Sequence, residues 1–193
     1  MEFTALLQNR QSVRQYDTKP VEREKLEKLI DAVRLAPSAS NSQPWKLIIV
    51  EDPGLKDQVA KSTFNRVVSF NKFTVSAPVL AVLVIEKPKK ITQIGGMIKQ
   101  RDFPLIDIGI AAEHFCLQAA DLGLGSCMLG WFNERRIKQL LHIPRELRIG
   151  LVITLGYPPE GYPLRPKSRK KAAAMSSYNE YSGNAEETPR KGA

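Results

Sequence analysis

The segment from Leu105 to Leu122 is apolar on nearly every face of a helix, and few folds can accommodate such an element. A helix on the surface of a soluble protein carries one apolar stripe, whereas a helix that is apolar all round must be buried. Its apolar positions include Ile106, Ile108, Ile110, Ala111, Ala112, Phe115, Leu117, Ala119 and Ala120. We therefore expect this helix to lie inside the domain or against a second subunit.

Four other segments have the composition of β-strands. Residues 78–85 are apolar on both faces, which predicts a fully buried strand. Residues 45–51 and 148–155 are rich in Leu, Ile and Val, and residues 124–131 read Leu-Gly-Ser-Cys-Met-Leu-Gly-Trp; we predict three further strands there. We expect a sheet with a buried central strand.

Further helices are predicted between these strands. Apolar residues at helical spacing predict a helix from Pro20 to Ala36, and shorter patterns predict helices near Phe3, over residues 55–70 and from Asn133 to Leu141. Residues 86–104 contain several Lys and Arg residues and a Gly pair. We interpret them as a loop, either a mobile segment that covers a site or a plain surface connection.

The composition favours one domain of a soluble protein. The chain has 193 residues, of which 42% are hydrophobic, and it has two Cys and two His residues. Both cysteines lie in apolar stretches, and neither His has a partner at ligand spacing, so we expect reduced core cysteines and no metal site. The N-terminus lacks the pattern of a signal peptide, and no apolar run is long enough to span a bilayer. We expect a cytoplasmic protein with no membrane partner.

The net charge of +9 suggests an anionic partner. Nucleic acid, an acidic membrane surface and a phosphorylated cofactor all remain open on charge alone. The basic residues are partly concentrated, because Arg165, Lys167, Arg169, Lys170 and Lys171 fall within seven positions.

Two segments place basic residues in alternation. In an extended chain Arg10, Ser12 and Arg14 share one face, and so do Lys167 and Arg169. Guanidinium groups on either side of a hydroxyl suit a phosphate, which the guanidinium groups bind through paired hydrogen bonds. A solvated basic edge is the alternative interpretation of Arg10, Ser12 and Arg14.

A polar loop and a glycine-rich strand complete the set of candidate site segments. Residues 36–45 read Ala-Pro-Ser-Ala-Ser-Asn-Ser-Gln-Pro-Trp and predict an ordered loop, which is either a simple connection or a ligand-binding loop. Gly123, Gly125 and Gly130 do not form a dinucleotide fingerprint, because they follow a helix and enter a strand. Gly130 predicts a point where the backbone closely approaches another group.

Taken together, these segments resemble the FMN-dependent nitroreductase family. The resemblance rests on residues 10–14, 37–45, 123–130 and 167–169, in this order, and it covers about residues 3–171. It implies an α+β fold in which helices flank a central, mostly antiparallel sheet, with the long apolar helix at the core of a homodimer. Residues 1–171 would form a single FMN-binding domain, and residues 172–193 a tail that is extended over the partner subunit or disordered.

The resemblance also implies a cofactor site at the subunit interface. Arg10 and Ser12 would hold the FMN phosphate with Lys167 and Arg169, beside Gln11, and Arg14 would reach the ribityl chain or the pyrimidine. The partner subunit would contribute the loop residues Pro37, Ser38, Ala39, Asn41 and Gln43. Leu129 and Gly130 would lie beside the isoalloxazine ring, and Asn71 and Lys72 would contact the pyrimidine edge.

The implied activity passes reducing equivalents from NADH or NADPH, through flavin N5, to a small organic acceptor by a ping-pong mechanism. The acceptor would be a nitroaromatic, a quinone or an enone, and no side chain is nominated as a catalytic acid or base. Leu129 stands where some family members carry an acidic residue, which makes the substrate face more apolar. The alternatives are a basic nucleic-acid-binding module and a specialised flavin reductase with a non-nitro substrate.

Overall fold

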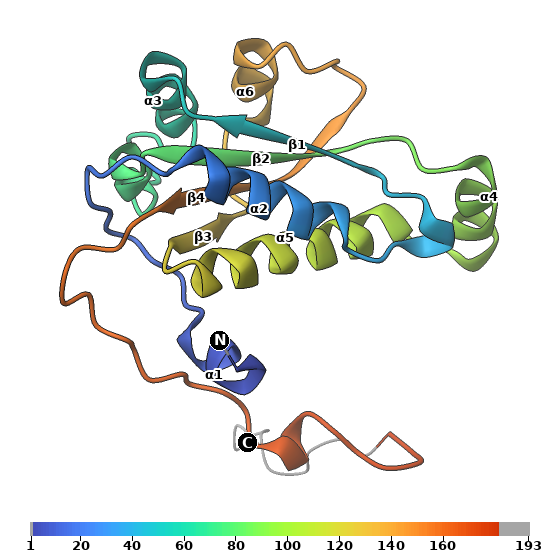
Figure 1. The fold of residues 1–193 in the computed structure, drawn as a ribbon. Coiled ribbons are helices and arrows are strands. Elements are labelled where there is room, and N and C mark those ends of the chain that lie inside the picture. Colours follow the sequence, from blue (N-terminus) through green and yellow to red (C-terminus); the bar gives the residue numbers. More distant parts are fainter. Residues whose placement is uncertain (1, 182–193) are drawn as a thin grey trace, which may run out of the picture.

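The computed structural model describes residues 2–181; Met1 and residues 182–193, which include most of the predicted tail, lie outside the described residues. Within the described range the chain forms a four-stranded sheet in the order β1-β2-β4-β3 (Figure 1). The strands are β1 (Trp45–Val50), β2 (Val79–Ile85), β3 (Gly125–Leu129) and β4 (Arg148–Gly156). Each of the three strand pairs is antiparallel, which confirms the predicted α+β fold with an antiparallel sheet.

Helices cover both faces of this sheet. Helices α2 (Arg23–Arg34) and α5 (Phe103–Asp121) lie on one face, and α3 (Pro53–Lys61) and α6 (Glu134–Leu140) lie on the other (Figure 1). One apolar cluster, which includes Phe115 of α5, fills the space between the sheet and the first pair of helices. A second cluster fills the opposite face, so β2 is buried from Val79 to Val84 as predicted.

Helix α3 is shorter than predicted, since it ends at Lys61 and not near Phe70. The residues that follow have side chains that hydrogen-bond to nearby backbone, which competes with helix formation. Ser62 Oγ donates to the carbonyl of Gln58 (2.9 Å), and Asn65 Oδ1 accepts from the N–H of Val67 (2.8 Å). A short 3₁₀ helix, η2 (Lys72–Ser76), then leads into β2.

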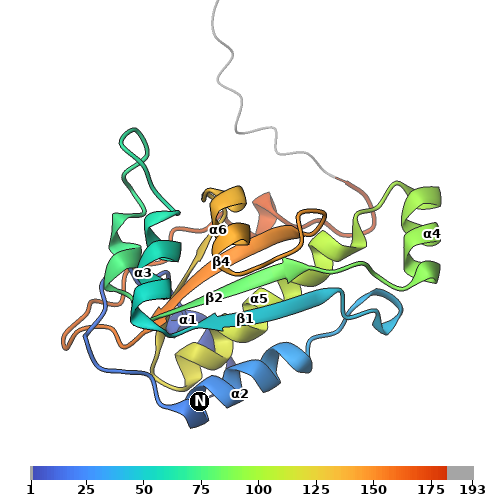
Figure 2. The same ribbon diagram turned by 90° about the horizontal axis from the view of Figure 1, so that it is seen from above.

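The prediction of a loop over residues 86–104 is wrong, because the middle of this segment forms helix α4 (Lys90–Lys99). Gly95 and Gly96 lower the intrinsic helix propensity, which favoured the loop interpretation. The apolar side chains of α4 lie largely on the surface; Met97 and Ile98 are each 72% exposed. The segment is therefore an ordered helix at one end of the sheet (Figure 2).

Apolar side chains also remain exposed near the chain ends. Phe3 of α1 (Phe3–Asn9) is 61% exposed, and α1 has no buried residue. On α5, one face is buried against the sheet, whereas Leu105 and Ile106 are exposed. Beyond β4 the chain runs past α1 and away from the sheet to a short 3₁₀ helix, η3 (Ala172–Ala174) (Figure 1). No described helix combines the length and apolarity needed to cross a membrane.

Candidate functional site

The extended segment that follows α1 docks along β3. The N–H of Val13 donates to the carbonyl of Ser126 (2.9 Å), and Ser12 and Ser126 form a parallel bridge. Gly125 permits this approach, because a Cβ at that position would lie 2.7 Å from Cβ of Val13. Val13 is buried, as the alternation predicts, and the Arg14 side chain is exposed.

The second basic segment, from the C-terminal part of the chain, lies beside the first. Gln11 Nε2 donates to the carbonyl of Pro163 (3.0 Å), and Gln11 Oε1 accepts from the N–H of Arg165 (3.1 Å). Lys167 Nζ donates to the carbonyl of Arg10. The structure thus brings together the two segments whose basic residues alternate in the sequence, and Gln11 joins them.

Arg165 belongs to the same group, although it was not among the predicted site residues. Its guanidinium group donates to the carbonyl of Ser12 and to Gln11 Oε1. A signal for it was present, because residues 165, 167 and 169 are all basic and alternate along an extended chain.

Positive charge exceeds negative charge in this cluster. Burial lowers the pKa of the Lys167 ammonium group, and the positive charges of Arg10 and Arg169 lower it further. The carboxylate of Glu113, which lies 3.3 Å from Nε of Arg10, opposes this effect on the pKa of Lys167. Cations that the fold holds together against their mutual repulsion are suited to a multiply charged anion such as a phosphate ester.

Two buried cysteines lie near this cluster. Cys116 and Cys127 are both free and buried, which confirms the prediction of reduced core cysteines. Burial raises the pKa of the Cys116 thiol to about 12. Burial also raises the pKa of Cys127, although the positive charge of Arg14 opposes this shift. Both thiols therefore stay protonated at neutral pH, so neither is a nucleophile in a reaction at this site.

The end of β3 offers exposed backbone at Gly130, four residues beyond Ser126, on which the first basic segment docks. Leu129 is 5% exposed and belongs to the core of the α3–α6 face, whereas Gly130 is exposed. A Cβ at Gly130 would have no heavy atom within 4 Å. No described part of this chain makes the close approach that the glycine predicted, and the position is open to a bound molecule.

Asn71 connects the end of β3 to the segment that follows α3. Its side chain is buried, and its Nδ2 donates to the carbonyls of Thr63 and Trp131, each at 3.1 Å. Lys72 is exposed, and the next residue, Phe73, has its ring centroid 5.9 Å from Cζ of Arg14. The side-chain amide nitrogen of Asn71 thus donates both of its hydrogens to backbone carbonyls, and the residue positions the backbone at the end of β3.

We expect the substitution Asn71→Ala to lower the free energy of unfolding by about 2 kcal/mol, because two backbone carbonyls lose their donor in a buried place. Denaturant unfolding of the variant and of the native chain measures the difference. Lys72→Ala is the matched control and should change stability by less than about 0.5 kcal/mol, because the Lys72 side chain is exposed. Equal stability of the two variants would contradict the positioning role of Asn71.

The predicted loop, residues 37–43, has unusual backbone geometry. Ser40, Asn41 and Gln43 all have positive φ, at 52°, 49° and 48°, a conformation that residues other than glycine rarely adopt. Gln43 Nε2 donates to Asn41 Oδ1 (2.7 Å), and the N–H of Gln43 donates to Ser38 Oγ (2.8 Å). Backbone strain that is held by a local hydrogen-bond network is typical of functional loops.

The loop is fastened to the start of α5 by a buried carboxylate. Asp107 Oδ1 accepts from the N–H of Ala39 (3.1 Å), whereas Asp107 Oδ2 has no hydrogen-bond partner among the described residues. Burial raises the pKa of this carboxyl group above its ordinary value. Pro37 and Asn41 are exposed on the same loop.

The predicted site residues therefore form two groups at opposite ends of the sheet (Figures 1 and 2). The loop leads into Trp45, which pairs with Ile85 at one end of β2. The basic cluster docks on Ser126, which pairs with Leu155 near the other end. One chain does not bring the two groups together.

Comparison with known proteins identifies the fold and the family. The model of the nitroreductase family matches residues 7–157. The chain belongs to the nitroreductase family. The crystal structure of a nitroreductase family protein from Clostridium novyi is 34% identical, with a TM-score of 0.74, and the match covers 83% of this chain and 87% of that one.

Two further relatives have names that bear on the chemistry. An FMN-dependent nitroreductase from Clostridium difficile is 26% identical, with a TM-score of 0.74, and the match covers 93% of this chain and all of that one. An NADH dehydrogenase from Thermus thermophilus is 28% identical over 83% of this chain and 88% of its own length. These matches confirm the predicted family, the fold class and the assignment of the chain as an oxidoreductase.

Proposed function

We propose that the protein is an FMN-dependent oxidoreductase that transfers reducing equivalents from NADH or NADPH to a small organic acceptor. The observation that carries this proposal is the convergence of three cations, Arg10, Lys167 and Arg169, on one side of the described fold, where the single carboxylate of Glu113 opposes their charge in part. FMN ends in a phosphate of about two negative charges, and burial of such a group requires converging cations.

The basic cluster fits the phosphate end of FMN. Arg10 and Lys167 are both partly buried, and Lys167 is fixed on the backbone of Arg10. Ser12 adds a hydroxyl between two arginines, and Arg165 and Gln11 hold the two segments together. In this proposal Arg169 completes the phosphate site and Arg14 reaches toward the ribityl chain.

The loop with positive φ completes the site from a second subunit. Because residues 37–43 lie at the far end of the sheet from the basic cluster, they reach an FMN molecule bound there only from another copy of the chain. The exposed apolar side chains of α1, α5 and the C-terminal segment, which include Phe3, Ile106 and Met175, supply the kind of surface that a homodimer buries.

The flavin supplies the redox chemistry when it is bound, by accepting hydride at N5 and passing it on. The residues of the chain bind and orient the cofactor. Gly130 leaves room for the ring system beside exposed backbone, and the neighbouring Leu129 is buried in the core and brings no charge to this end of β3. Because one open site serves donor and acceptor in turn, the kinetics are ping-pong.

In this proposal the acceptor is a nitroaromatic, a quinone or an enone without strong charge, since the buried Leu129 places no charged side chain at the end of β3. Two free, buried cysteines suit a cytoplasmic enzyme, because free thiols persist in a reducing compartment.

The visible absorption spectrum of the purified protein tests the proposal. We expect flavin bands near about 370 and 450 nm, release of FMN rather than FAD on heating, and bleaching of the bands by NADH or NADPH under anaerobic conditions. A colourless protein that takes up no added FMN would overturn the proposal. Salt-sensitive binding of DNA by such a colourless protein would reassign the basic cluster to nucleic acid.

A further inference from the structure

We infer that a cavity between the end of α3 and the start of α6 binds the phosphate-bearing adenosine end of the nicotinamide dinucleotide. The cavity has a volume of about 520 Å³ and is separate from the basic cluster of residues 10–14 and 165–169. The inference rests on the proposed function and deepens it, because it assigns a place to the electron donor.

The charge of the cavity favours a phosphate ligand. Lys61 and Arg136 line it, and no Asp or Glu is among the described residues of its wall. Asp57 lies outside this wall, and its carboxylate is already bound by Lys56 at 2.6 Å. Two cations without a carboxylate between them can both donate to the oxygens of one phosphate or pyrophosphate.

The aromatic lining favours a ligand that also carries a flat ring. Phe64, Trp131 and Phe132 contribute to the wall, and Trp131 is 56% exposed. The half-exposed indole of Trp131 is available to stack on a nucleobase. Every nucleobase has a flat face that stacks on an aromatic ring, so this contact does not depend on which base the ligand carries. Cations and aromatic side chains in one cavity match a nucleotide better than a simple anion or an uncharged aromatic substrate.

The walls of the cavity are fixed in relation to the end of β3. The N–H of Asn133 donates to the carbonyl of Ser62 (2.7 Å), which ties the start of α6 to the end of α3. Asn71 ties the same two segments together through the carbonyls of Thr63 and Trp131. Trp131 directly follows Gly130, so a dinucleotide whose nicotinamide lies beside Gly130 has this cavity as the adjoining place for its other end.

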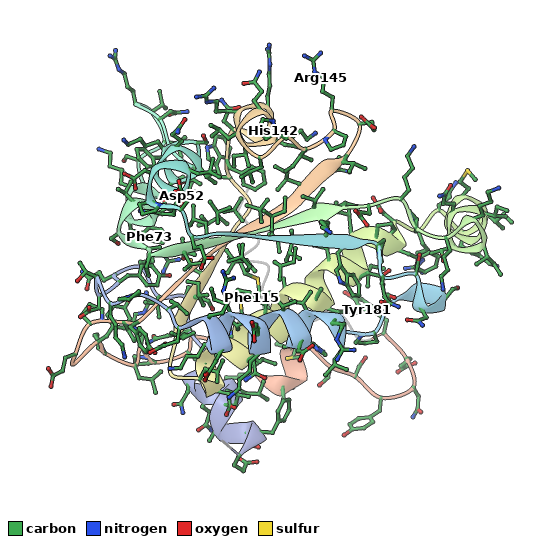
Figure 3. All side chains as sticks on the ribbon, turned by 45° about the horizontal axis from the view of Figure 1, so that its top comes forward. Asp52, Phe73, Phe115, His142, Arg145 and Tyr181 are labelled. Atoms are coloured by element: carbon green, nitrogen blue, oxygen red, sulfur yellow. The ribbon has the colours of Figure 1, made fainter. Side chains whose placement is uncertain are left out.

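A larger groove on the other side of α6 serves as an internal comparison. It is lined by Arg135, Lys138, His142 and Arg145, of which His142 and Arg145 are labelled in Figure 3. Its lysine is paired with Glu134 at 2.8 Å, and no Phe, Tyr or Trp side chain is among its described lining residues. It is basic but has no large aromatic ring like those of Phe64, Trp131 and Phe132, so it separates the effect of general positive charge from that of the cavity.

The test uses the full chain loaded with FMN and the probe adenosine 2′,5′-bisphosphate, which carries the adenosine end of the donor and no nicotinamide. Binding is followed by calorimetry and by quenching of Trp131 fluorescence, with Trp45 as the only other tryptophan. We expect the double variant Lys61→Gln, Arg136→Gln to raise the Kd for the probe about tenfold or more at low salt. The matched control Arg135→Gln, Arg145→Gln removes two positive charges from the comparison groove and should stay within about twofold of the native chain.

Steady-state kinetics then locate the phosphate that is bound. If the double variant has a raised KM for NADPH alone, the inference is supported and Lys61 and Arg136 bind the 2′-phosphate. If its KM rises for both NADH and NADPH, the inference is supported and the two residues bind the pyrophosphate. The inference fails if the native holoprotein does not bind the probe, or if the double variant and the control behave alike. The FMN content of each protein is measured independently, from its flavin absorbance. A native protein without FMN would count against the proposed function, whereas a native holoprotein that does not bind the probe would count against this inference alone.

Discussion

Arg10→Ala and Lys167→Ala should each raise the Kd for FMN by about 10- to 100-fold, because each removes a charged donor from a phosphate site that is partly buried. Lys167→Ala also releases the carbonyl of Arg10, to which Lys167 donates. We expect the double variant to emerge from purification without flavin. Fluorescence titration of the apoprotein with FMN measures the affinity, since flavin emission changes on binding.

The matched control for this prediction is Lys170→Ala, which removes an exposed cation from the same C-terminal segment. It should change the Kd by less than about threefold. The rate of flavin reduction in the fraction that retains FMN should stay near that of the native enzyme, because the phosphate lies away from the reacting ring. Native affinity in Arg10→Ala or Lys167→Ala would remove these residues from the proposed phosphate site.

Local sequence patterns were sufficient to predict most of the elements. The alternation of Arg10, Ser12 and Arg14 around the buried Val13 reflects a period that the extended backbone itself imposes. The apolar run of β2 likewise predicts burial on both faces, because no polar side chain is present to face water. Such predictions succeed where a single local property decides the outcome.

The sequence was less informative where several weak effects compete. Helix α4 was missed although Ile91, Ile94 and Ile98 stand at helical spacing, because its glycine pair opposes helix formation and the surrounding Lys and Arg residues favoured a surface loop. The extension of α3 to Phe70 failed because Ser62, Thr63 and Asn65 hydrogen-bond to nearby backbone groups, which no hydrophobic pattern records.

Contacts between residues that are far apart in the sequence could not be predicted, for a different reason. The sequence presents Asn71 as a polar residue near other candidate site residues, yet the fold uses its amide to hold two backbone carbonyls. The cavity of Lys61 and Arg136 joins residues 75 positions apart, and Arg165 reaches Ser12 across 153 positions. No local pattern contains these distances, because they are set by how the helices pack on the sheet.

A mixed dimer should recover FMN binding from two defective subunits. One subunit carries Arg10→Ala and Lys167→Ala, which damage the basic cluster, and the other carries Asn41→Ala and Gln43→Ala, which damage the loop. Each homodimer has two damaged sites. If every site combines the cluster of one subunit with the loop of its partner, the mixed dimer has one site with both defects and one intact site, and should bind about one FMN per dimer.

Co-expression of the two subunits with different affinity tags allows the mixed dimer to be isolated by two successive purifications, and its absorbance then gives the flavin content. The control pairs an Arg10→Ala subunit with a Lys167→Ala subunit, both altered in the same cluster, and it should recover nothing. A first pair that binds no more FMN than its parent homodimers would contradict the shared site. That result would require residues 37–43 to act within their own chain, at the end of the sheet where Asp107 holds them.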